Sequence, residues 1–164
     1  MIRTATKEDA EAIAEIYNYY IANTIITFEE HAIAKDEMAN RIDSTIRDKL
    51  PWLIAEENKN VLGYAYASKW KGRCAYKHSV ETTVYLDQSA TSKGLGTALY
   101  NSLLTKLKDE KLHVAIGGIA LPNPSSIALH EKLGFEKVGQ FNEVGNKFGS
   151  WVDVGYWQLT LNKY

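Results

Sequence analysis

The sequence lacks several features that would place a protein in a special class. Its single cysteine, Cys74, cannot form an internal disulfide, so the chain suits a reducing compartment and we predict a cytoplasmic protein. No local motif marks Cys74 as a nucleophile, and an ordinary thiol is the simpler interpretation. No apolar run approaches the ~20 residues of a membrane-spanning helix. Acidic residues from Glu8 to Glu15 interrupt the N-terminus, where a signal peptide would be apolar.

An excess of charge is also missing. The 19 basic and 20 acidic residues give a formal net charge of −1, which leaves no basic footprint for nucleic acid or an anionic membrane. His31 and His113 have no metal-like spacing with any other ligand, so we predict no metal site. The chain shows no repeat, linker or low-complexity segment.

What is present suits one globular domain covering residues 1–164, with 45% hydrophobic and 24% charged residues. Hydrophobic periodicity predicts the order β-α-α-β-β-β-α-β-α-β-β, which indicates a mixed α/β fold. Strands are expected at 2–5, 52–56, 61–68, 78–86, 114–120, 135–141 and 151–161, the last two joined by a glycine-containing loop. Helices are expected to begin at Thr6, Lys35, Thr97 and Pro124. Residues 21–29 have no clean period and are interpreted as a loop or short helix that borders a pocket.

The strand at 80–86 runs into a glycine-containing loop, Thr91-Ser92-Lys93-Gly94-Leu95-Gly96-Thr97. Glycine lets the backbone approach a ligand closely, and N–H groups at a helix start bind anions. The pattern therefore predicts a phosphate-bearing ligand, with Glu81 in the strand that leads to it. It is not a Walker loop, because no Gly-Lys-Ser/Thr follows. It is not a full dinucleotide fingerprint, because a third spaced glycine and a downstream acidic residue are missing.

A second pattern begins with Asn123 at the end of a strand, continues through a short helix and ends at Gly134-Phe135. With the glycine loop, it resembles the GNAT superfamily of N-acetyltransferases, whose cofactor loop follows Gln/Arg-x-x-Gly-x-Gly/Ala. The resemblance covers the whole chain in element order and is sharpest from Glu81 to Phe135. One departure is that Thr91 occupies the Gln/Arg position, where Lys93 can supply a charge nearby.

A narrower similarity is to the phosphinothricin N-acetyltransferase subgroup. It is carried by Val80-Glu81-x-x-Val84-Tyr85, Leu121-Pro122-Asn123-x-x-Ser126-x-x-x-His130 and residues 145–158. Members of this subgroup acetylate small amino acid analogues, including methionine sulfone and methionine sulfoximine. The similarity implies such an analogue as the amine acceptor here.

The resemblance implies the GNAT fold, a mixed and mostly antiparallel central sheet with helices on both faces. It also implies acetyl-CoA as cosubstrate, with its pantetheine arm paired to a strand and its pyrophosphate in the glycine loop. The cofactor-binding residues so implied are Val84, Tyr85, Leu86, Ser92, Lys93, Gly94, Leu95, Gly96, Thr97 and Asn123. Asn123 can also simply cap a helix, and we favour a double role.

Two residues are implied for catalysis. Acyl transfer needs a neutral amine, and Glu81 is expected to accept its proton directly or through water. His130 stands where the superfamily usually has tyrosine, and it can protonate the thiolate leaving group. A strand N–H near Val84-Tyr85 is a candidate donor to the oxyanion, in a direct transfer within a ternary complex. The plainer alternatives are a Glu81 on a solvent-facing strand surface and a His130 on a helix surface.

The residues expected to bind the acceptor are Phe28, Lys77, His78, Ser79, Lys147 and Phe148. The last two are candidates to come from a neighbouring subunit. Lys77 and Lys147 favour an anionic acceptor over the alternatives, a polyamine or a peptide N-terminus. Thr91 also keeps open an inactive acyl-CoA-binding module, although the presence of Glu81 argues against it.

The C-terminal strand is rich in aromatic residues. Trp151, Tyr156 and Trp157 make it more apolar than the exposed edge of a monomer should be. Because such residues are enriched at protein interfaces, we predict a homodimer.

Overall fold

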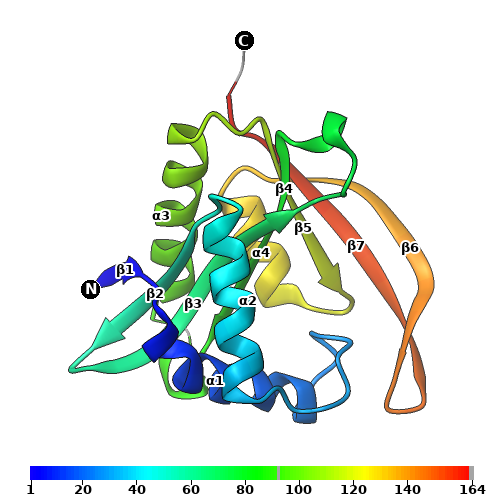
Figure 1. The fold of residues 1–164 in the computed structure, drawn as a ribbon. Helices are drawn as coiled ribbons and strands as arrows, with labels where there is room; N and C mark the ends of the chain where they lie inside the picture. Colours follow the sequence, from blue (N-terminus) through cyan, green and yellow to red (C-terminus); the bar gives the residue numbers. More distant parts are fainter. Residues whose placement is uncertain (92, 163–164) are drawn as a thin grey trace.

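The computed structural model describes residues 1–91 and 93–162. These residues form one seven-stranded sheet of order β1-β2-β3-β4-β5-β7-β6, with four α-helices (Figure 1). The strands are β1 (Ile2–Thr4), β2 (Trp52–Glu57), β3 (Asn60–Lys69), β4 (Ser79–Leu86), β5 (Val114–Ala120), β6 (Glu136–Lys147) and β7 (Ser150–Thr160). The α-helices are α1 (Ala10–Asn23), α2 (Lys35–Arg47), α3 (Leu95–Asp109) and α4 (Pro124–Lys132). Neighbouring strands are antiparallel except β4 and β5, so the predicted element order and the mostly antiparallel sheet are confirmed.

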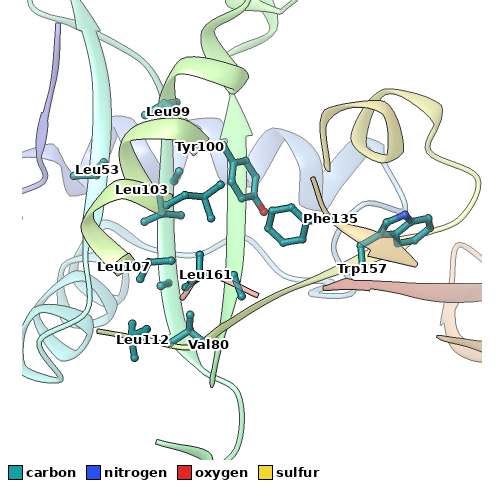
Figure 2. Close-up of a cluster of buried hydrophobic side chains, with 14 of the residues drawn as sticks. Leu53, Val80, Leu99, Tyr100, Leu103, Leu107, Leu112, Phe135, Trp157 and Leu161 are labelled. Carbon is teal, nitrogen blue, oxygen red and sulfur yellow. The ribbon is translucent and has the colours of Figure 1, made fainter. Parts of the chain in front are cut away.

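Helices cover both faces of the sheet. On one face, α1 and α2 bury a cluster that includes Ile13, Ile42 and Trp52. On the other face, Leu103 and its neighbours on α3 pack against the strands, and α4 packs at the edge of the same cluster. Figure 2 shows the α3 leucines in this cluster, with Tyr100 directed toward Phe135. The sheet is therefore buried on both sides along its middle, which gives the strands that carry the site a rigid base.

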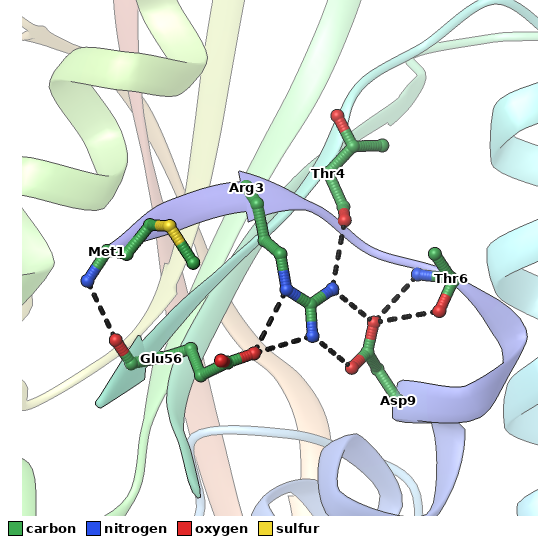
Figure 3. A network of polar contacts seen from close by, with 6 residues as sticks. All are labelled: Met1, Arg3, Thr4, Thr6, Asp9 and Glu56. Atoms are coloured by element: carbon green, nitrogen blue, oxygen red, sulfur yellow. Dashed lines mark hydrogen bonds and ion pairs between the residues drawn. The ribbon is translucent and has the colours of Figure 1, made fainter. Parts of the chain in front are cut away.

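The N-terminus is fastened by a network of polar contacts around Arg3 (Figure 3). The Arg3 guanidinium donates two hydrogen bonds of 2.8 Å to Asp9 and two, of 2.6 and 3.0 Å, to Glu56. The backbone N–H of Thr6 donates to Asp9 Oδ2 at 2.8 Å, which closes a capping box before a short 3-10 helix, η1 (Lys7–Asp9). Burial raises the pKa of Asp9, but these hydrogen bonds outweigh burial and hold that pKa below its usual range. Thr6 therefore caps the first helical segment, as predicted, and α1 follows the 3-10 turn.

Most strand boundaries lie within one residue of the prediction, and the larger differences are at two places. Helix α3 begins at Leu95 and not at Thr97, because Gly94 takes a left-handed conformation with φ 75° and acts as the N-cap. Strand β6 continues to Lys147, and the loop expected after residue 141 is mostly strand. The turn to β7 needs only Phe148 and Gly149, whose φ values of 53° and 74° match the twist of a two-residue hairpin.

Candidate active site

Strands β4 and β5 separate part-way along their length. Their parallel ladder begins at Ser79 and ends at the pair Glu81–Ile116, with no later pair in the described residues. Beyond this point β4 pairs with β3 and β5 pairs with β7. One backbone edge of Thr82–Leu86 is therefore without a strand partner in the described part of the chain. An extended ligand can pair with such an edge as an added strand would.

A cavity of about 370 Å³ lies at this separation. Residues from β4, β5, β7, α4 and the loop before α2 line it, so segments far apart in the sequence meet there. Of the residues predicted for the site, the cavity brings together Phe28, Glu81, Val84, Tyr85, Asn123 and His130.

A larger cavity of about 580 Å³ lies between α1, the β2–β3 turn and the end of β4, where Leu86 borders it. Its lining includes four carboxylates and a single lysine, Lys59. A phosphate group would be repelled there, so the cavity at the β4–β5 separation is the better candidate for the site.

Glu81 is the last residue of β4 that pairs with β5. Its Oε1 atom lies 3.5 Å from the position that a Cβ would take at Gly118. Burial raises the pKa of Glu81 and the charge of Lys71 lowers it, with a net shift above the usual value. A carboxylate with a raised pKa holds a proton more readily, which suits it to act as a general base near neutral pH.

His130 is hydrogen-bonded at both ring nitrogens and is only 4% exposed. Its Nδ1 lies 2.7 Å from the Ser126 carbonyl oxygen, and its Nε2 lies 2.8 Å from the Tyr100 hydroxyl. Burial lowers the pKa of His130, which favours the neutral ring. Since a carbonyl only accepts, we assign the proton to Nδ1, so that Nε2 accepts from Tyr100. The same hydroxyl lies 2.9 Å from Thr82 Oγ1, which links α3, α4 and β4 at the cavity wall.

The glycine loop leads to the N-terminus of α3, as predicted. The first bond of the helix runs from the N–H of Ala98 to the Gly94 carbonyl at 3.1 Å. The N–H groups of residues 95–97 precede that bond, and α3 itself offers them no acceptor. With the exposed Lys93 beside them, they form an arrangement that favours an anion. Ser92, also predicted to bind the cofactor, lies outside the described residues.

Asn123 is the N-cap of α4, with Pro124 in the first turn. Its side-chain oxygen accepts a hydrogen bond of 3.2 Å from the N–H of Ser126. Asn123 also lines the cavity. Because the oxygen is used by the cap, the carboxamide NH₂ group is the part of this side chain that can serve a ligand.

Residues 77–79 do not line the cavity, although they precede Glu81 closely in the sequence. Lys77 and His78 are exposed before β4 begins, and Ser79 is the first residue of that strand. The β4–β5 ladder is closed at Ser79 and opens only after Glu81, so these residues lie at the paired end of the two strands.

Lys147 and Phe148 also lie outside the lining of the cavity. Lys147 is 2% exposed, and its Nζ donates a hydrogen bond of 2.7 Å to the Thr27 carbonyl. Phe148 is 61% exposed at the turn between β6 and β7. Of the six residues predicted to bind the acceptor, Phe28 is the one that the structure places in the cavity wall.

Two residues near Glu81 were not predicted from the sequence. Tyr156 lines the cavity, and burial together with the charge of Glu81 raises its pKa. Alternation along β7 indicates this placement, because Trp157 is 2% exposed in the core and its neighbour must face the other side. Lys71 acts on Glu81 through its charge, and no sequence pattern separates it from the other lysines nearby.

The described residues contain no group of three or more His, Cys, Asp or Glu residues placed to hold a metal ion. None of their helices has the length and apolar character needed to cross a membrane. Cys74 is a free and exposed thiol.

Comparisons with known proteins agree with this geometry. The acetyltransferase (GNAT) domain family matches residues 2–155. A phosphinothricin N-acetyltransferase of Streptomyces viridochromogenes is 38% identical over 157 residues, which are 96% of this chain and 85% of that protein. An L-methionine sulfoximine/L-methionine sulfone acetyltransferase of Salmonella typhimurium is 34% identical over 163 residues, 99% of this chain and 95% of that protein. Among solved structures, a GNAT superfamily phosphinothricin acetyltransferase from Sinorhizobium meliloti in complex with acetyl-CoA matches with a TM-score of 0.96 and 37% identity. That match covers 99% of this chain and 88% of the other.

The fold is that of an acetyltransferase. The chain belongs to the GNAT acetyltransferase family. The resemblance that the glycine loop and the Asn123 helix indicate is therefore confirmed over nearly the whole length of the chain.

Proposed function

We propose that this enzyme transfers the acetyl group of acetyl-CoA to the amine of a small amino acid analogue of the phosphinothricin, methionine sulfone or methionine sulfoximine type. The observation that carries the proposal is the separation of β4 and β5 directly after Glu81, which sets a carboxylate at the closed end of an open backbone edge. The names of the relatives supply the acceptor class.

The proposed cofactor site extends along that edge. The pantetheine arm of acetyl-CoA pairs with the backbone of β4 at residues 84–86, and the Asn123 carboxamide donates to it from the opposite wall. The pyrophosphate lies against the N–H groups at the start of α3, near Lys93. Acetyl-CoA supplies the activated acetyl thioester. Thr91 replaces the usual Gln or Arg of the cofactor loop, and its hydroxyl donates to the Gln88 carbonyl at 3.1 Å instead of to a ligand. The loss weakens pyrophosphate binding little, because the N–H groups at the start of α3 remain.

In the proposed reaction the new C–N bond forms as the C–S bond of the thioester breaks. Glu81 accepts the proton that the attacking ammonium must lose, and its raised pKa matches that task. The backbone N–H groups near Val84 and Tyr85 donate to the developing oxyanion. The leaving thiolate takes a proton from the Tyr100–His130 pair. In this pair the Tyr100 hydroxyl holds the transferable proton and faces the cavity, because Nε2 of the neutral His130 ring is unprotonated. The phenolate that remains regains a proton from water after CoA leaves.

The acceptor class rests on more than the relatives' names. Lys71 acts on Glu81 through its charge, which favours an acceptor that carries an anionic or strongly polar group. The sequence also predicts an anionic acceptor from Lys77 and Lys147, but neither of these residues lines the cavity. A polyamine or a peptide N-terminus is the alternative acceptor.

The test is release of CoA from acetyl-CoA, screened with phosphinothricin, methionine sulfone, methionine sulfoximine, ordinary amino acids and a polyamine. Turnover confined to the amino acid analogues supports the proposal. Turnover of the polyamine alone would mean that the acceptor is a polyamine and not an amino acid analogue. Acetyl-CoA binding without turnover of any amine would point to an inactive acyl-CoA-binding module.

Glu81→Gln tests the chemistry. It is expected to lower kcat by roughly 10²- to 10⁴-fold, because an amide cannot accept the proton. Acetyl-CoA binding, measured by calorimetry, should persist. An unchanged kcat would mean that another group or bulk water removes the proton.

We also propose that the protein is a cytoplasmic homodimer. Four large apolar side chains on the β6–β7 hairpin lie outside the cavity lining and are between 59% and 66% exposed: Val138, Phe141, Phe148 and Trp151. Of the three aromatic residues first assigned to an interface, Trp157 belongs to the core and Tyr156 to the cavity, so Trp151 is the one that remains. The free Cys74 supports a reducing compartment.

A further inference from the structure

Lys147 is a buried cation that the proposed chemistry does not use. It ends β6 with 2% exposure, and its Nζ donates 2.7 Å to the carbonyl of Thr27, a residue 120 positions earlier in the chain. The Phe148 ring centroid lies 5.0 Å from the same Nζ. None of the described ion pairs includes Lys147, and the charge of Glu30 is the acidic influence on it. A buried ammonium loses its hydration, so its placement against one carbonyl calls for an explanation.

The carbonyl that Lys147 binds belongs to a wall of the cavity. Residues 26–28, in the loop between α1 and α2, line the cavity beside Glu81. This loop is also anchored to its own helices. The Asn18 side chain exchanges two hydrogen bonds with the backbone of Ile33, Arg41 pairs with Glu29 at 2.7 Å, and the Thr27 hydroxyl lies 2.7 Å from the Tyr17 hydroxyl. The hydrogen bond from Lys147 to the Thr27 carbonyl ties this wall, residues 26–28, to the β6–β7 hairpin.

A second contact lies two residues away on the same strand. A Cβ at Gly145 would come within 2.4 Å of the Phe28 ring, so the ring rests directly on the backbone of β6. Residues 145 and 147 point to the same side of a strand. Side by side, they hold Thr27 by a hydrogen bond and Phe28 by packing.

We propose that Lys147 is a positioning residue for the acceptor. It holds the Thr27–Phe28 wall against the β6–β7 hairpin and so sets the shape of the acceptor end of the cavity, without touching the acceptor itself. The inference rests on the proposed acetyl transfer and refines the original assignment of Lys147 as a direct ligand. Gly145 takes part because only a residue without a side chain leaves room for the Phe28 ring.

Lys147→Met tests the inference, because Met matches the length of lysine and cannot donate. Replacing a buried charge by an apolar isostere is often neutral or stabilising, so the fold and the melting temperature should persist. The KM for the acceptor should rise roughly five- to tenfold, while the KM for acetyl-CoA stays at the wild-type value. Lys147→Arg, which can still donate, should recover part of the loss. Lys137→Met on the same strand is the matched control and should change neither constant.

Hydrogen exchange supplies a readout that does not depend on turnover. The amides of residues 24–34 should exchange faster in Lys147→Met than in wild type, with exchange elsewhere unchanged. Gly145→Ala should raise the acceptor KM independently, by displacing Phe28.

The outcomes distinguish a failure of the positioning role of Lys147 from a failure of the proposed acetyl transfer. Wild-type turnover with an unchanged acceptor KM in Lys147→Met overturns the positioning role. Unchanged exchange at residues 24–34 overturns it even if the wild type acetylates nothing. A wild type without turnover, but with faster exchange in the variant, refutes the proposed function and upholds the contact as the element that holds the wall.

Discussion

Two opposing effects set the pKa of the Glu81 carboxylate. Burial raises this pKa, and the positive charge of Lys71 lowers it. A general base works only when deprotonated, so activity falls as the pH drops through the pKa of Glu81. Lys71→Met removes the lowering effect, and the acid limb of the pH profile of kcat/KM should therefore move to higher pH. Initial rates with saturating acetyl-CoA across the pH range measure this shift.

Lys69→Met is the control for that prediction. Lys69 ends β3 two residues before Lys71 and pairs with Asp48 at 2.6 Å, so its loss should leave the acid limb in place. The ionisation of the acceptor amine is the same for every variant and cancels in the comparison. An acid limb that stays at the wild-type pH in Lys71→Met would contradict the coupling of Lys71 to the base.

Gly117 makes room for the His130 ring. A Cβ at residue 117 would lie 2.5 Å from Nε2, closer than side chains approach one another. Gly117→Ala should displace the ring and break its contact with Tyr100, which lowers kcat. Overpacking should also cost about 1–3 kcal/mol of unfolding free energy. Gly139→Ala, with no atom within 4 Å of the added carbon, should leave kcat and the melting temperature unchanged. Wild-type kcat in Gly117→Ala would argue against a role for the Tyr100–His130 pair.

At the residue scale, sequence reasoning found the groups that belong to a local motif and missed those brought in by pairing. Glu81 and Asn123 stand at fixed places in strand–loop–helix patterns, and the cavity contains both. Nearness to Glu81 in the chain predicts Lys77 in the site, but the separation of β4 from β5 begins only after Glu81. Where two parallel strands part depends on their register, which no local pattern encodes.

At the scale of the elements, Asn123 has two roles, because it caps helix α4 and also lines the cavity. Asn123→Ala removes the side-chain acceptor for the Ser126 N–H and should cost about 1 kcal/mol of unfolding free energy. The KM for acetyl-CoA should rise as well, because the carboxamide NH₂ group is lost. Asn123→Ser separates the two roles, since serine caps helices nearly as well but carries no carboxamide. We expect serine to restore the melting temperature and not the KM. Recovery of both would reduce Asn123 to a helix cap.

The boundaries of helices and strands were predicted accurately where the local sequence pattern is strong. Hydrophobic periodicity predicts a helix that begins at Lys35, which is the first residue of α2 in the structure. The β6–β7 turn was predicted poorly, because glycines at 145 and 149 suggested a loop where the structure has mostly a strand with irregular pairing. Both residues of the turn lie in the left-handed region, and the first is Phe148, a bulky residue that local preference places elsewhere. The close pairing of β6 with β7 outweighs that preference.

At the scale of the whole molecule, the sheet order explains why the site includes residues from both ends of the chain. Strand β7 inserts between β5 and β6, which puts the C-terminal hairpin next to the β4–β5 separation. The hairpin then meets the loop after α1 through Lys147 and Thr27. Figure 1 shows this hairpin reaching along the side of the sheet, with β6 at its edge. The same segment thus borders the acceptor end of the cavity and presents an apolar surface outward.

That apolar surface predicts the oligomeric state. Val138 and Trp151 are 60% and 66% exposed, and β6 is an edge strand with unpaired backbone groups on its outer side in the described part of the chain. A monomer that left this surface in water would be prone to associate, so we expect a stable dimer in light scattering and analytical ultracentrifugation.

Val138→Lys should shift the protein toward monomer, because dimerisation would bury an unpaired charge. Trp151→Lys should do the same, while Ile46→Lys on α2, at a residue 42% exposed and outside the hairpin, should not. A wild-type protein that stays monomeric at every concentration would end the dimer proposal. The acceptor-site contacts of Lys147, which lie within one protomer, would be unaffected.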